Sequence, residues 1–180
     1  MNKTFCFLTV LFFSVATSNA QSVFDYKLKT LSGDSLSISR FALKKTMFII
    51  VPLNQQDAVY GQLQEFKNRY ADSINIVGIV SKEDGYQSSQ LSAMLNLYTS
   101  MGIILTEALY TRKSSGANQS ELLQWLTNKN KNRHFNNDAS GVGSKFFIGE
   151  TGRLFAVLPP QASLQLPLID NIVHSAPANQ

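Results

Sequence analysis

Cysteine is almost missing from this chain of 180 residues, which contains only Cys6. Thiol catalysis and disulfide bonds both need cysteine in the folded part of a protein. Cys6 lies inside an apolar N-terminal run that we expect to be removed, so it supplies neither. The remaining chain is long enough to bury a core without disulfides. We therefore expect a mature protein that uses no thiol of its own.

Histidine and strong charge are also scarce. His134 and His174 are the only two histidines, which is too few for a zinc or copper site with three or four ligands. The formal net charge is +4, a surplus too small to indicate the basic face of a nucleic-acid-binding protein. The sequence has no glycine-rich phosphate loop after a strand and no Gly-x-Ser-x-Gly elbow. We expect no metal, no cofactor, no nucleic-acid partner and no hydrolase chemistry.

The first residues have the pattern of a signal peptide. Lys3 supplies a positive charge, Phe5–Val15 is a short apolar run, and Ser18–Ala20 gives the small-x-small pattern of a cleavage site. The run is shorter than the roughly 20 residues needed to span a bilayer. Gln21 is the expected first residue of the mature protein.

This pattern sets the expected organisation of the chain. Residues 1–20 are the predicted signal peptide, residues 21–174 one domain, and residues 175–180 a flexible tail. A domain of this size is ordinary for a single core. The predicted protein is exported, to the periplasm or the extracellular medium, and is free of the membrane after cleavage.

Two contiguous apolar runs, Thr46–Leu53 and Ile74–Val80, predict strands that are covered on both faces. Between them, a polar loop (54–57) precedes a helical stripe of apolar residues that ends near Tyr70. A strand, a helix and a second buried strand form a parallel βαβ unit. Before them, the alternation in residues 24–29 and 36–39 predicts a β-hairpin.

The second half of the chain adds further elements. We predict a helix with apolar residues Leu91–Tyr98, capped by Ser88 or Ser89, and a helix over Leu122–Leu126 behind Ser120. Residues 129–144 show no periodicity. Strands Lys145–Ile148 and Arg153–Leu158 form an antiparallel pair, and a helix with Leu168–Val173 ends the domain. The predicted fold is α/β and thioredoxin-like: a central mixed sheet with an N-terminal β-hairpin, a βαβ unit, an antiparallel C-terminal hairpin and flanking helices.

Four segments carry a resemblance to one family within this fold class. They are SVFDYKLKTLSGDSLSISRF, VYGQLQEFKNRYAD, ELLQWLTNK and KFFIGETGRL, which begin at residues 22, 59, 121 and 145. In this order and spacing they resemble the first hairpin, first helix, late helix and last strands of the glutathione peroxidases, across essentially the whole mature chain. Peroxiredoxin-like and disulfide-reductase-like proteins of the same fold are the alternative.

The resemblance implies reduction of hydroperoxides by a cysteine or selenocysteine, supported by Gln, Trp and Asn side chains. Carried over by position, the nucleophile falls at Asn54, the Gln at Glu83, and the Trp-Asn pair at Gly141 and Val142. None of the four residue types is retained. An amide is no substitute for a thiolate nucleophile, and a glutamate at the Gln position adds a negative charge that opposes an anion. We expect no catalytic residues in this chain.

The predicted site is therefore a degenerate active site that binds instead of reacting. Ligands of open α/β sheets lie at the carboxyl ends of the strands. There we expect Gln55, Gln56, Asp57 and Asp84 to line a cleft beside the four degenerate positions. The expected occupant is an unidentified peptide, protein or small polar ligand. Two alternatives remain: a peroxidase or redoxin of the oxidative-stress response that uses a partner's thiol or a cofactor, and a purely structural subunit.

Overall fold

A computed structural model describes residues 22–70 and 72–175 of the chain. The expected signal peptide and residues 176–180 of the expected tail lie outside this description. In the described part of the chain, no helix is both long enough and apolar enough to cross a membrane.

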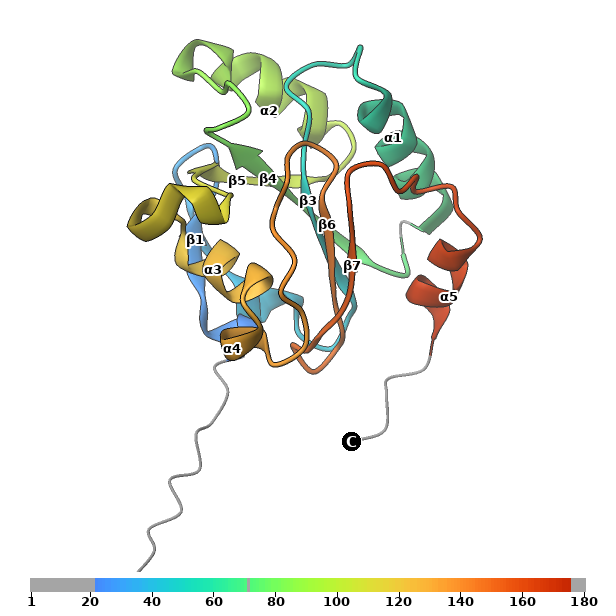
Figure 1. The fold of residues 1–180 in the computed structure, drawn as a ribbon. Helices are drawn as coiled ribbons and strands as arrows, with labels where there is room; N and C mark the ends of the chain where they lie inside the picture. Colours follow the sequence, from blue (N-terminus) through green and yellow to red (C-terminus); the bar gives the residue numbers. More distant parts are fainter. Residues whose placement is uncertain (1–21, 71, 176–180) are drawn as a thin grey trace, which may run out of the picture.

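A five-stranded mixed sheet forms the centre of the domain (Figure 1). Its strands are β3 (Thr46–Ile50), β4 (Asn75–Ser81), β5 (Ile104–Leu109), β6 (Lys145–Ile148) and β7 (Leu154–Leu158), in the order β5-β4-β3-β6-β7. β3, β4 and β5 are parallel, whereas β6 runs antiparallel to β3 and β7 antiparallel to β6. The predicted mixed sheet is confirmed.

The central strand β3 is buried on both faces, as its contiguous apolar sequence predicts. Met47 and Ile49 belong to the core on one face of the sheet, and Phe48 and Ile50 to the core on the other. Phe48 lies opposite Val77 of β4 and Phe146 of β6. Each face of this strand therefore needs a layer of its own to exclude water.

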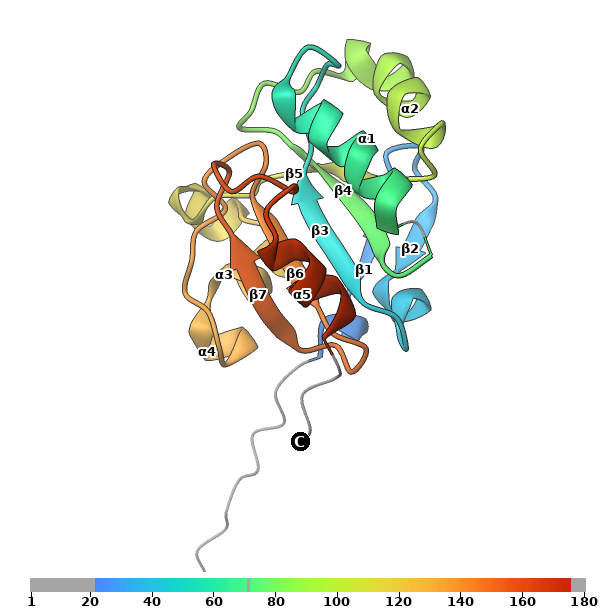
Figure 2. The ribbon, with the colours of Figure 1, turned by 90° about the vertical axis from the view of Figure 1, so that its right-hand side faces the viewer.

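Helices supply those layers. One face is covered by α1 (Ala58–Tyr70), α2 (Leu91–Thr99) and α5 (Leu168–His174). The other carries α3 (Glu121–Thr127), the adjoining α4 (Lys129–Asn132) and the hairpin of β1 (Lys27–Lys29) and β2 (Ser35–Ser37). Figure 2 shows α1 and α5 in front of the sheet, with α3 and α4 behind it. A short 3-10 segment at Val23–Asp25 precedes β1, and others lie in connections at Ile38–Phe41, Ser88–Gln90 and Lys113–Asn118.

Three local predictions are corrected. Strand β5 was not predicted, because Thr106 and Glu107 interrupt its apolar residues. The first strand begins at Lys27 and not at residue 24, because the preceding residues form a 3-10 turn capped by Ser22. Neither Ser88 nor Ser89 caps the helix α2: they lie inside a 3-10 turn that begins after Gln87, whose amide donates to the Gln90 side chain over 2.8 Å.

The N-terminal hairpin covers part of the edge that β5 leaves open. Thr30 pairs with Thr106 in an isolated antiparallel bridge, and the Leu31 amide donates to the carbonyl of Leu105 over 3.0 Å. This contact satisfies backbone groups of an edge strand that would otherwise offer a template for another chain.

A buried lysine fixes the C-terminal helix to the start of β3. Lys45 is 4% exposed, and its ammonium donates to the carbonyls of Ile172, Val173 and Ser175 over 2.9, 3.0 and 2.6 Å. These are carbonyls at the end of α5, where a cation also complements the helix dipole. Burial lowers the pKa of Lys45 from its ordinary value, and the nearby Glu150 opposes that effect.

We expect the substitution Lys45→Met to lower the free energy of unfolding by about 2 kcal/mol, because hydrogen bonds from a charged donor are lost and carbonyls are left unpaired. Amide exchange should accelerate in α5 before it does in β3. The control is Lys44→Met, since the Lys44 side chain makes no hydrogen bond within the described residues. Equal stability of the two variants would contradict this role of Lys45.

Candidate functional site

Four connections meet at the carboxyl edge of the parallel strands. They follow β3 (residues 51–57), β4 (82–87) and β5 (110–112), and the fourth (141–144) precedes the antiparallel β6. Because β6 runs against β3, its beginning lies at the same edge as the end of β3. The predicted site residues are all in these connections.

The connection after β3 carries Asn54, the position predicted for the nucleophile. Asn54 is exposed, and its side-chain oxygen accepts a hydrogen bond from the Gln56 amide over 3.0 Å. Asp57 binds the first turn of the helix that follows. Its carboxylate accepts a hydrogen bond from the Val59 amide over 2.8 Å, and its carbonyl accepts one from the Tyr60 amide. Asp57 thus caps α1, whereas Asn54, Gln55 and Gln56 face solvent.

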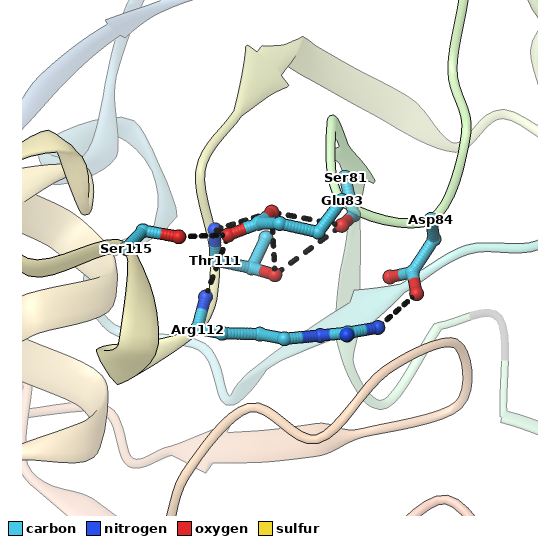
Figure 3. A network of polar contacts seen from close by, with 6 residues as sticks. All are labelled: Ser81, Glu83, Asp84, Thr111, Arg112 and Ser115. Carbon is cyan, nitrogen blue, oxygen red and sulfur yellow. Dashed lines mark hydrogen bonds and ion pairs between the residues drawn. The ribbon is translucent and has the colours of Figure 1, made fainter.

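Glu83, at the position predicted for the Gln, is held by the segment that follows β5 (Figure 3). Its carboxylate accepts hydrogen bonds from the amides of Thr111 and Arg112, over 2.9 and 3.1 Å, and from the hydroxyl of Ser115 over 2.5 Å. Burial acts to raise the pKa of Glu83, but the hydrogen bonds from Ser115, Thr111 and Arg112 outweigh it and lower the pKa to about 2. The residue is an anion with its oxygens already engaged.

Asp84 turns the other way and pairs with Arg112 over 2.5 Å (Figure 3). Gly141 lies against this ion pair: a Cβ placed on it would be 3.6 Å from both the Arg112 guanidinium and the Asp84 carboxylate. The second Asp84 oxygen and the Arg112 Nε are buried without a partner in the described structure. The two acids therefore connect loops of the protein to one another.

The turn before β6 is tightly packed. The Gly143 amide donates to the Ile50 carbonyl over 2.8 Å, and a Cβ on Gly143 would lie 3.1 Å from the Val59 side chain and 3.3 Å from the Pro160 carbonyl. Its φ of 87° is also one that side chains rarely adopt. Val142 is half-buried against the core on the α3 face. This turn sits directly against the start of α1.

A second buried lysine supports that turn. Lys145 is 1% exposed, and its ammonium donates to the carbonyls of Gly143 and Ala162, each over 2.6 Å. Burial lowers the pKa of Lys145 to about 8. The side chain links the turn before β6 with the turn after β7.

The predicted cleft thus consists of two parts with different properties. Glu83, Asp84 and Gly141 lie together in a region where Glu83 is held by hydrogen bonds and Asp84 by an ion pair with Arg112. Asn54, Gln55 and Gln56 line a separate groove with a volume of 440 Å³, formed with Leu53, Tyr60 and residues Ala93, Asn96, Leu97 and Ser100. The residues on and just after α2 were not predicted, although the polar Asn96 on a helix with an apolar stripe was the available signal.

The two histidines lie apart and away from this edge. His174 packs on the Tyr70 ring at 5.8 Å between centroids, and His134 lies beside Phe135. Across residues 22–70 and 72–175, no group of three or more His, Cys, Asp or Glu side chains is arranged to hold a metal ion.

Comparison with solved structures places the chain in a fold class. It is similar to the apo form of Trgpx, a glutathione-peroxidase-like structure, with a TM-score of 0.60 and 18% identity over 88% of this chain and 100% of that one. It also resembles a thioredoxin-family thiol:disulfide interchange protein from Chlorobium tepidum (TM-score 0.53, 16% identity, 88% and 97% covered). A third structure is a secreted disulfide oxidoreductase of Mycobacterium tuberculosis (TM-score 0.51, 12% identity, 84% and 96% covered).

The predicted thioredoxin-like fold is confirmed by these likenesses, and its neighbours include glutathione-peroxidase-like structures, as the sequence motifs indicated. No family model matches the chain, and no curated protein matches its sequence. At these identities the likeness establishes the fold, while the roles of Asn54, Glu83, Gly141 and Val142 remain predictions.

We expect Glu83→Gln to lower the free energy of unfolding at pH 7 by about 1–2 kcal/mol, a range discounted for the partial exposure of the side chain. Because the folded pKa of Glu83 is about 2 and the ordinary value 4.5, the stabilisation is complete above the ordinary value and is lost as the pH falls toward 2. The difference between wild type and variant should therefore shrink between pH 5 and pH 2 in urea titrations. Asp72→Asn, an exposed acid without a hydrogen-bond partner in the described structure, is the control; a pH-independent difference would contradict the proposed cause.

Lys145 should give a dependence of the same sign as Glu83, but at alkaline pH. Its folded pKa of about 8 lies below the ordinary 10.5, so the folded state loses the proton first and stability rises with pH between these values. We expect wild type to gain about 2 kcal/mol relative to Lys145→Met between pH 8 and pH 10. Lys67→Met, which removes a less buried amine, should not change this pH dependence. Parallel curves for wild type and Lys145→Met would show that Lys145 keeps an ordinary pKa.

Proposed function

We propose that this protein is an exported binding module on a thioredoxin-like fold that has no peroxidase activity of its own. The single observation that carries the proposal is the amide of Asn54 at the position implied for the nucleophile, with no cysteine anywhere in residues 7–180. An amide has no ionised form at neutral pH with which to attack a peroxide.

The surroundings of the site support the same proposal. Peroxide reduction by a thiolate is helped by neutral or positive groups that stabilise an anion. Glu83 and Asp84 place carboxylates in the connection after β4, and Arg112, the nearby cation, is paired with Asp84. Because the Arg112 guanidinium is paired with Asp84, it contributes little to stabilising an anion formed during peroxide reduction.

Export is supported by the sequence and by one likeness. The pattern in residues 1–20 is that of a signal peptide, and the similar structure from Mycobacterium tuberculosis is described as a secreted protein. A cysteine-free mature chain is also indifferent to the redox state of the compartment that it enters.

The direct test is hydroperoxide reduction by the purified mature chain, with glutathione and then thioredoxin as reductant and with metals removed. We expect turnover no higher than that of the heat-denatured protein, and the same background rate for Asn54→Ala. Turnover well above background in both proteins would overturn the proposal, and it would favour an enzyme that borrows a partner's thiol or a cofactor. Turnover lost specifically in Asn54→Ala would show instead that Asn54 takes part in a reaction.

A further inference from the structure

Buried contacts join the two walls of the amide-lined groove, which lies between the β3–α1 connection and α2. The Tyr98 hydroxyl of α2 donates to the Pro52 carbonyl over 2.7 Å, and Tyr98 is fully buried. Tyr60 packs edge-on against Tyr98 at 5.9 Å between ring centroids and lines the groove. A buried hydrogen bond and a ring contact thus hold the two walls together, and a ligand would meet a preformed site.

The lining of the groove mixes amide and apolar side chains and carries no charged side chain. Gln55, Gln56 and Asn96 are exposed, and within the described structure their side-chain amides form no hydrogen bond. The Asn54 side chain uses its oxygen to accept from Gln56 and has its NH₂ available. The groove therefore offers several unused donors and acceptors on two facing elements, in contrast to the engaged carboxylates of Glu83 and Asp84.

Apolar side chains lie between these amides. Leu53 and Leu97 are half-buried, and Ala93 is exposed beside them. A volume of 440 Å³ is within the range of small-ligand sites. The lining thus combines amide groups, which match the donors and acceptors of a peptide bond, with a surface suited to an aliphatic side chain.

We infer that this groove binds a short, extended and uncharged peptide segment, with its main chain on the amides and an aliphatic side chain over Leu53 and Leu97. The inference rests on the proposed function, of which it names the ligand class. A charged segment would lose hydration without gaining an opposite charge. A sugar is disfavoured because Tyr60, the aromatic residue of the lining, is only 8% exposed and presents no open ring face.

The test is an NMR titration of the mature chain with blocked pentapeptides. The panel is acetyl-Ser-Asn-X-Gln-Ser-amide with X as Ala, Val, Leu or Phe, together with forms in which Asp and Glu, or two Lys, replace Asn and Gln. We expect saturable shifts in residues 53–56 and 93–100 with the neutral peptides, the Leu peptide binding best. The charged forms should bind at least fivefold more weakly.

Variants locate the binding. Gln56→Ala combined with Asn96→Ala should weaken the Leu peptide about tenfold, which corresponds to about 1.4 kcal/mol and to the loss of one or two hydrogen bonds. Ala93→Phe should fill the groove and abolish the shifts. Gln64→Ala, which removes an exposed amide of α1 outside the groove, should leave the affinity unchanged. Unaltered circular dichroism would exclude misfolding of each variant.

Three results would overturn the inference: no saturable shift with any neutral peptide, equal binding of charged and neutral forms, or saturation of the groove by cellotriose but not by peptide. These results are separable from failure of the proposed function. Peroxide turnover would overturn the binding-module proposal whatever the titration shows. If neither peroxide turnover nor a saturable shift is detected, the ligand assignment is overturned and the binding-module proposal is not.

Discussion

Burial of β3 on both faces is the constraint on which the rest of this structure depends. A strand that carries five buried residues in succession must have a layer on each side, and its parallel pairing with β4 requires a crossover that α1 provides. These two requirements place the end of β3, the start of α1 and the end of β4 at one edge of the sheet. The candidate site lies there because of the topology, whichever side chains occupy it.

The side chains at this edge of the sheet determine which interactions the candidate site can make. In this protein the two acids after β4 act as cross-links between loops: Glu83 holds the segment that follows β5, and Asp84 holds Arg112 against Gly141. Each charge is compensated by neighbours, as burial of charge demands. The amides on the β3–α1 connection and on α2, in contrast, are neutral and line the exposed groove at this edge.

Sequence patterns predicted the strands and helices whose burial has a clear period. Such patterns correctly predicted β3, α1, β4 and β6. A contiguous apolar run indicates a buried strand, and helically spaced apolar residues indicate a helix with one buried face. β5 was missed, since a sequence with Thr106 and Glu107 at its centre has no such pattern and becomes a strand through pairing with β4 and the N-terminal hairpin. The division of the cleft was equally inaccessible, because the Glu83 carboxylate is bound by residues about 30 positions away, which no local pattern contains.

Lys145 connects the stability of the fold to the geometry of the open groove. An apolar side chain of similar length would fill its place without the desolvation penalty of a buried amine. The amine instead binds the carbonyl of Gly143, and Gly143 packs against Val59 at the start of α1. The turn before β6 thereby supports the helix end that follows Asn54, Gln55 and Gln56, while Tyr98 fixes the opposite wall through Pro52. Both walls of the groove are thus held by buried polar contacts, and support of this kind is what the proposed binding site would need to be preformed.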